Sequence, residues 1–153
     1  MTLAEERLAA LGLTLPELPV PVATYVPFKR HGGVIYLSGQ GPKKPDGTYH
    51  VGLVGADVSV EDAYGHARLV GLQLLAAAKA AAGALDRVQI LKVFGMVRAA
   101  PEFADHPKVI NGCSDLLVAV LGDDGRHARS AVGMGSLPNR MTVEIECVIA
   151  LKD

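Results

Sequence analysis

Three charged residues near the end of the chain stand in otherwise apolar, β-rich surroundings and could bind or activate a small molecule. Arg129 lies in the first of two such runs, and Glu144 and Glu146 lie in the second, after a Pro-Asn turn. Side chains alternate between the two faces of a strand, so both glutamates share one face. The opposite face is apolar and comprises Val143, Ile145, Cys147, Ile149 and Leu151. Because ionised groups are costly to bury without a partner, something nearby must neutralise or use these carboxylates.

Arg129 admits two interpretations. Small residues, among them Ala131, share its face of the strand and leave room for the guanidinium to hold a small carboxylate through two hydrogen bonds. The alternative is a structural salt bridge to Glu144 or Glu146, and the residues alone favour that alternative slightly. Glu144 could also act as a general base, because burial moves the pKa of a carboxyl group toward neutrality. Glu146 is predicted to be a buried structural carboxylate.

A turn with two glycines, Ser38-Gly39-Gln40-Gly41, is a second candidate for ligand contact. Glycines leave backbone N–H and C=O groups accessible to a ligand. Ser38 has no flanking His-Asp order that would favour a catalytic triad, so a turn serine is the safer interpretation. Tyr25 taken alone is a core aromatic of a strand. The histidines and cysteines have neither HExxH nor CxxC spacing, so no metal site is predicted.

The elements that must position these residues follow from hydrophobic period and capping signals. We expect a short N-terminal helix after Thr2, helices at 60–82 and 107–121, strands at 22–29, 34–38 and 87–99, and a terminal hairpin carrying Arg129 and Glu144. After the first helix the order is β-β-α-β-α-β-β, which predicts an α+β fold with the helices on one face of a mixed sheet. The other face needs cover, and a partner subunit could supply it.

Composition limits the class of protein. A chain of 153 residues predicts one domain, 1–153, in which residues 1–20 form an N-terminal helix and a Pro-rich extension. The net charge is −1, tryptophan is absent and Lys and Arg are scattered, which argues against nucleic-acid binding. The charged N-terminus predicts neither a signal peptide nor a membrane span, and the two separate cysteines indicate the cytoplasm. High mean hydropathy without a membrane segment favours an oligomer.

The motifs, taken in order, resemble the RidA/YjgF family of small enamine/imine deaminases, also described as endoribonuclease L-PSP or chorismate-mutase-like proteins. The resemblance covers nearly the whole chain after residue 20. It rests on Tyr25, Ile35-Tyr36-Leu37-Ser38-Gly39-Gln40, Ala82-Gly83, Val88, Asn111, Ala128-Arg129-Ser130-Ala131-Val132, Leu137-Pro138 and Val143-Glu144-Ile145-Glu146. Each motif is weak by itself, but their order and spacing are specific.

The resemblance implies a chorismate-mutase-like homotrimer in which the sheets form a central barrel and ligand clefts lie between subunits. It implies that Arg129 holds the carboxylate of a small metabolite and that Glu144 orients or deprotonates the attacking water. The residues implied to line the cleft are Tyr25, Ser38, Gly39, Asn111 and Ala131. The implied reaction converts a 2-imino or 2-enamino acid into a 2-keto acid and ammonia, without a metal or an organic cofactor.

The chain departs from the family pattern near the expected cleft. Ala131 replaces a frequent cysteine, Cys113-Ser114 replaces a frequent aromatic residue, and the segment Phe103–Asn111 is longer. With the extra N-terminal helix, these features resemble a longer subgroup of the superfamily. A non-catalytic carboxylate-binding trimer is therefore the main alternative to a deaminase, and a ribonuclease or a purely structural trimer is less well supported.

Overall fold

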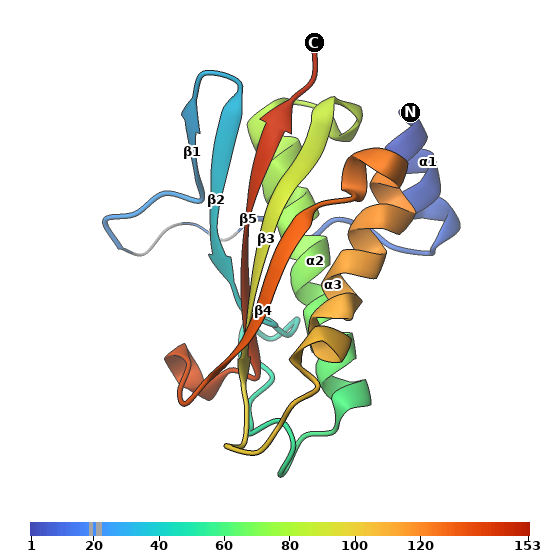
Figure 1. The fold of residues 1–153 in the computed structure, drawn as a ribbon. Coiled ribbons are helices and arrows are strands. Elements are labelled where there is room, and N and C mark those ends of the chain that lie inside the picture. The colour runs from blue at the N-terminus through green and yellow to red at the C-terminus, as the bar shows by residue number, and fades with distance from the viewer. Residues whose placement is uncertain (19, 21–22) are drawn as a thin grey trace.

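The fold is a five-stranded sheet with two long helices against one face, seen in a computed structural model that describes residues 1–18, 20 and 23–153 (Figure 1). The helices are α1 (Leu3–Ala10), α2 (Val60–Ala82) and α3 (His106–Leu121). The strands are β1 (Phe28–His31), β2 (Val34–Gln40), β3 (Val88–Arg98), β4 (Ala128–Met134) and β5 (Val143–Leu151). Short 3-10 turns are η1 (Leu85–Arg87), η2 (Gly122–Gly125) and η3 (Pro138–Arg140). This arrangement confirms the predicted α+β class.

The strand order in the sheet is β1-β2-β5-β3-β4. All neighbouring strands are antiparallel except β3 and β4, which run parallel. The predicted terminal hairpin is therefore wrong, because β3 lies between β4 and β5. A two-residue turn can join only adjacent strands. The connection through η3 is longer and can pass over β3, since neighbouring strands lie about 4.8 Å apart.

Capping residues fix both ends of α2 as the sequence predicts. The Ser59 hydroxyl accepts a hydrogen bond from the backbone N–H of Asp62, and Gly83 ends the helix with a left-handed φ of 85°. The buried face of α2 packs against α3 and the sheet. Gly112 of α3 sits at this contact, where a Cβ would collide with the carbonyl oxygen of Tyr64. The two helices therefore approach closely enough to exclude any larger side chain at Gly112.

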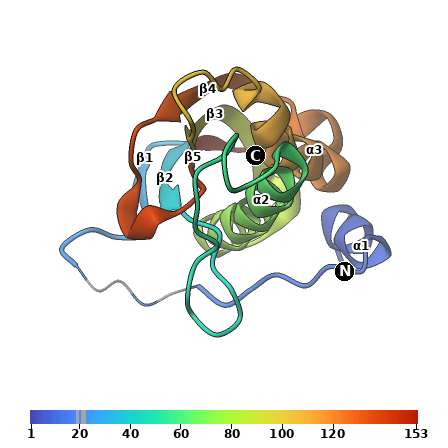
Figure 2. The same cartoon turned by 90° about the horizontal axis from the view of Figure 1, so that it is seen from below.

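The N-terminal helix is fastened to the helix layer and lies away from the sheet (Figure 2). Thr2 and Glu5 form the predicted capping box, and Asp86 accepts hydrogen bonds from the N–H groups of Leu3 and Ala4. These contacts use donors at the start of α1 that the helix itself leaves unpaired.

The first strand begins later than the sequence predicts. Part of the expected segment 22–29, residue 22, lies outside the described residues, and regular pairing starts only at Phe28. Pro27 precedes this strand and has no N–H to donate to a ladder, although its carbonyl accepts from Ser38 N–H. The prediction of a strand from residue 23 to residue 27 is therefore wrong.

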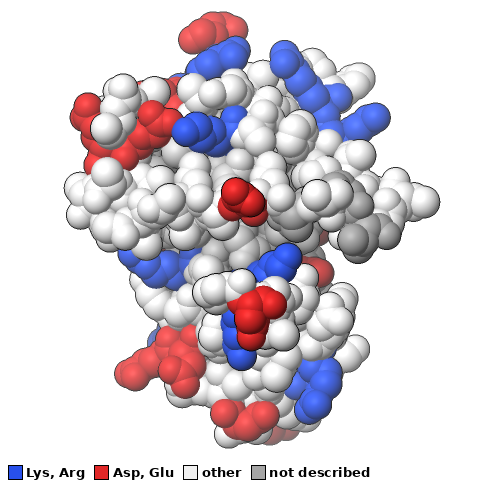
Figure 3. Space-filling view, turned by 180° about the vertical axis from the view of Figure 1, so that it is seen from behind, with Lys and Arg blue, Asp and Glu red and all other residues white. Residues whose placement is uncertain are grey.

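The second face of the sheet has no cover within the described part of the chain. Tyr36 is 55% exposed and Val132 is 37% exposed, and both belong to strands of this open face. On the surface seen from behind, acidic and basic side chains are interspersed and form no track of one sign (Figure 3). None of the described helices is long and apolar enough to span a membrane.

Candidate functional site

A hollow of about 620 Å³ lies between the end of β2, the start of β5 and the η3 turn. It brings together Tyr25, Ser38, Gly39 and Glu144, which the motifs had singled out and which come from three separate parts of the sequence. A volume of this size suits a small molecule. The hollow opens on the uncovered side of the sheet.

An irregularity in β2 shapes the wall of the hollow. The register with β5 shifts between Leu37 and Gln40, which leaves Ser38 and Gly39 without regular partners. A Cβ at Gly39 would lie 3.3 Å from the Cδ atom of Glu144, so the glycine gives this carboxylate its space. The Ser38 hydroxyl donates to the carbonyl oxygen of Val26 at 2.5 Å. Ser38 is thus a structural donor here, as the sequence indicates.

Glu144 is half-buried, and no ion pair involving it occurs among the described residues. Burial and, secondly, the negative charge of Glu146 raise the pKa of Glu144. A carboxylate with a raised pKa is a stronger base than an exposed one. Glu146 lines the same hollow but is exposed, so the expectation that it is a buried structural carboxylate is wrong. The negative charge of Glu146 instead contributes to the raised pKa of Glu144.

Arg129 lies on the other face of the sheet, against α3. Its Nη1 atom donates to Asn111 Oδ1 at 2.8 Å and to Ser114 Oγ at 3.1 Å. Neither partner is charged, and no carboxylate of the described residues is within ion-pair distance of Arg129. The predicted salt bridge to Glu144 or Glu146 is therefore not formed within one chain. Since a guanidinium carries more N–H donors than these two bonds use, Arg129 can still bind an anion.

The candidate residues thus form two groups within one chain. The Glu144 group faces the hollow, whereas Arg129, Asn111 and the half-buried Ala131 lie at β4 and α3. Because β4 is the edge strand of the sheet, one side of its backbone has no strand partner in the described chain. The residues that the family resemblance implies for one cleft are therefore not all brought together within one subunit.

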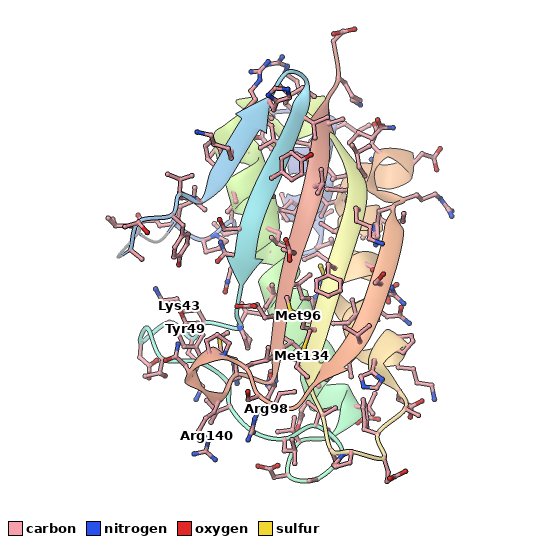
Figure 4. All side chains as sticks on the ribbon, turned by 60° about the vertical axis from the view of Figure 1, so that its left-hand side comes forward. Lys43, Tyr49, Met96, Arg98, Met134 and Arg140 are labelled. Atoms are coloured by element: carbon pink, nitrogen blue, oxygen red, sulfur yellow. The ribbon has the colours of Figure 1, made fainter. Side chains whose placement is uncertain are left out.

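Several polar residues near the hollow are not singled out by the sequence analysis. Figure 4 shows that Lys43, Tyr49, Met96, Arg98, Met134 and Arg140 gather where the open face of the sheet ends. Lys43, Tyr49 and Asn139 line the hollow directly. Asn139 and Arg140 both have positive φ angles, 54° and 57°, a costly conformation for residues other than glycine. The Pro-Asn turn signal located this segment, but only the fold brings it to the hollow.

Two histidines also meet in a way that sequence spacing does not reveal. The rings of His50 and His66 stack with centroids 4.1 Å apart, and His66 Nδ1 lies 2.9 Å from Thr142 Oγ1. Burial and, secondly, the positive charge that His50 can carry lower the pKa of His66 to about 4. His66 is therefore neutral near pH 7 and fastens the loop of His50 to α2.

The two cysteines are buried free thiols, and burial raises the pKa of Cys113 to about 12. A thiol with so high a pKa is not a nucleophile near neutral pH. Within the described ranges 1–18, 20 and 23–153, no three His, Cys, Asp or Glu side chains cluster as metal ligands would.

Comparison with known proteins finds a matching family and a similar sequence. Residues 5–151 match the sequence profile of the YjgF/chorismate mutase-like endoribonuclease family. The chain is 37% identical to protein TCP17 of Trypanosoma cruzi over 149 residues, which cover 96% of this chain and 93% of that protein.

Two solved structures are similar to the fold. The first is protein Atu1372 of Agrobacterium tumefaciens, whose function is unknown, with a TM-score of 0.88, 43% identity, and coverage of 98% of this chain and 94% of that one. The second is RidA from the Antarctic bacterium Psychrobacter sp. PAMC 21119, with a TM-score of 0.61, 26% identity, and coverage of 87% and 93%.

Proposed function

The chain belongs to the YjgF/chorismate mutase-like endoribonuclease family, and from that premise we propose that it hydrolyses reactive 2-imino and 2-enamino acids to 2-keto acids and ammonia. The reaction takes place in clefts between the subunits of a homotrimer. The proposal rests on two observations: Glu144 is half-buried with a raised pKa in an open hollow, and Arg129, on the edge strand β4, has no carboxylate partner among the described residues.

The uncovered sheet face supports the trimer. Exposed apolar side chains such as Tyr36 and Val132 favour burial against another copy, at roughly 25 cal/mol per Å² of apolar surface. A neighbour that covers this face brings its own edge strand β4, with Arg129, beside the hollow of the first subunit. The buried free thiols suit a reducing compartment such as the cytoplasm.

In the proposed mechanism, Arg129 holds the substrate carboxylate and so presents the adjacent imine carbon to a water near Glu144. As the oxygen of the water bonds to the imine carbon, Glu144 takes one proton from this water, and the imine nitrogen takes a proton from solvent. Glu144 then gives its proton to the amino group of the tetrahedral intermediate. The C–N bond breaks, ammonia leaves, and the hydroxyl group loses its proton to solvent as it becomes the keto group. The imine carbon is already electrophilic, so one positioned base and one anion clamp suffice, without a metal or an organic cofactor.

The test couples the purified protein to a pyridoxal-phosphate-dependent dehydratase and its amino acid, and follows release of the 2-keto acid. We expect the wild type to accelerate release over the buffer rate. Arg129→Ala and Glu144→Gln should both remove this acceleration, whereas Arg30→Ala, at an exposed arginine of β1, should keep it. Native mass spectrometry should show a trimer for all four proteins. A wild type that leaves the rate at the buffer value for several amino acids would refute the deaminase.

Non-catalytic carboxylate binding is the second candidate, because Ala131 supplies no thiol and the Ser38 hydroxyl is already hydrogen-bonded to Val26. Saturable binding of 2-oxobutanoate in calorimetry, without any turnover, would favour this function over hydrolysis. Ribonuclease activity has less support, since Lys and Arg are scattered along the sequence and the face in Figure 3 shows no basic track.

A further inference from the structure

A line of hydrogen bonds behind Arg129 has no part in the chemistry described above. Arg129 Nη1 donates to Ser114 Oγ at 3.1 Å, and Ser114 Oγ lies 2.9 Å from His127 Nε2. His127 Nδ1 in turn lies 2.6 Å from the carbonyl oxygen of Gly125. The three side chains come from β4, α3 and the segment after η2, and all are half-buried.

Only one placement of the hydrogen atoms gives every hydrogen bond in this line a donor and an acceptor. A carbonyl oxygen only accepts, so the hydrogen of a neutral His127 must sit on Nδ1, facing Gly125. Nε2 is then a bare acceptor and takes the hydroxyl hydrogen of Ser114. The lone pairs of Ser114 Oγ are left for the N–H of Arg129. Every donor meets one acceptor, provided that His127 stays uncharged.

We propose that Ser114 and His127 are positioning residues that fix the guanidinium of Arg129 in the orientation that binds a carboxylate. The Asn111 bond alone leaves the guanidinium plane free to swing about one contact. A second acceptor at Ser114, itself held by His127 and Gly125, removes that freedom and leaves the remaining donors for the ligand. The identity of that ligand rests on the proposed function, but the positioning does not.

The surroundings keep His127 neutral. Burial and, after the opposing hydrogen bond to Gly125, the positive charge of Arg129 lower the pKa of His127. The charged side chains on the elements packed around His127 have other partners. Asp123 pairs with Arg126, Asp124 with Lys152, Asp115 accepts from Tyr64, and Lys92 donates to Ser130. Acidification therefore adds a proton at Nε2. The Ser114 hydroxyl then loses its acceptor, and its oxygen faces two positively charged donors, which weakens its hold on Arg129.

A ligand-free experiment tests the positioning directly by nitrogen-15 NMR of the whole protein. In the wild type, His127 should be the tautomer protonated at Nδ1, and the Arg129 Nη protons should give separate, slowly exchanging signals. Ser114→Ala should merge the Arg129 signals, whereas Ser114→Thr, which retains a hydroxyl, and Ser136→Ala, at an exposed serine, should not. A wild-type His127 protonated at Nε2, or unchanged Arg129 signals in Ser114→Ala, would overturn the proposal.

Binding of 2-oxobutanoate then measures the consequence. Loss of one charge-assisted acceptor should weaken binding about tenfold in Ser114→Ala, and Ser114→Thr should restore most of it. The affinity of the wild type for 2-oxobutanoate should decrease as the pH falls below the pKa of His127. This decrease should be smaller in His127→Gln and unchanged in His31→Gln, at an exposed histidine. An equally steep fall in His127→Gln would overturn the role of His127. If the wild type binds no 2-oxobutanoate, the proposed function loses support, and the ligand-free NMR still decides the positioning.

Discussion

Mixing two inactive variants would show whether each active cleft combines residues of two subunits. Arg129→Ala keeps Glu144 and loses the clamp, whereas Glu144→Gln keeps the clamp and loses the base. If a cleft takes Arg129 from one subunit and Glu144 from the next, a trimer that contains both variants regains one intact cleft. If both residues of a cleft belong to one chain, no arrangement restores it.

The expected yield follows from the symmetry of a ring of three. In a random equal mixture, about three quarters of the trimers contain both variants, and each of these has one intact cleft among three. We therefore expect about a quarter of the wild-type rate per subunit. A second mixture, of wild type with the double variant Arg129→Ala/Glu144→Gln, should also give about a quarter, whereas clefts within one chain would give about a half.

The assay requires subunit exchange, by joint refolding from denaturant, followed by the coupled keto-acid measurement at fixed protein concentration. Each variant refolded alone is the control for residual activity, and native mass spectrometry reports the mixed trimers. Mixed trimers that form but show no activity above these controls, with a wild type that is active, would refute the shared cleft.

Three further predictions concern stability and pH. Gly112→Ala should lower the free energy of unfolding by about 1–3 kcal/mol, because a Cβ at this position collides with the α2 backbone. Gly65→Ala should raise it by about 0.5–1 kcal/mol, because a Cβ there meets nothing within 4 Å. Equal shifts of the melting temperature in the two variants would contradict this. Because burial and then the charge of Glu146 raise the pKa of Glu144, Glu146→Gln should keep Glu144 ionised at lower pH and so extend the proposed hydrolysis to lower pH. A rate that falls at the same acidic pH as in the wild type would count against this. The pKa of His66 is lowered to about 4 in the folded chain, so the unfolded chain binds a proton at this histidine at higher pH than the folded chain does. The free energy of unfolding therefore decreases as the pH falls from about 6.5 to 4. His66→Gln should reduce that loss in urea unfolding, and a curve parallel to wild type would contradict it.

Local interactions explain why the helices could be predicted so closely. The start of α2 depends on Ser59 and Asp62, three residues apart, and its end depends on Gly83 alone. The capping box of Thr2 and Glu5 is equally local. Signals of this kind need no knowledge of the fold, because all the atoms involved lie within one turn of the chain.

Strand neighbours could not be predicted in the same way. The pairing of β4 with β3 joins Arg129 to Val93, which is 36 positions earlier, and no local residue records that choice. The Pro-Asn turn correctly marked a reversal, but the chain reverses direction equally well across a third strand. The stacking of His50 on His66 and the contact of Ser114 with His127 depend on the same long-range choices.

The position of β3 between β4 and β5 decides whether Arg129 and Glu144 of one subunit can act on the same ligand. Val93 is the register partner of Arg129 in β4 and of Cys147 in β5, so Arg129 and Cys147 share the helix-covered face. Glu144 lies an odd number of positions from Cys147 and must therefore point to the open face. No side-chain rotation within one subunit carries a guanidinium through a paired sheet. In the proposed hydrolysis, therefore, either a second copy supplies the arginine to each hollow or Arg129 takes no part.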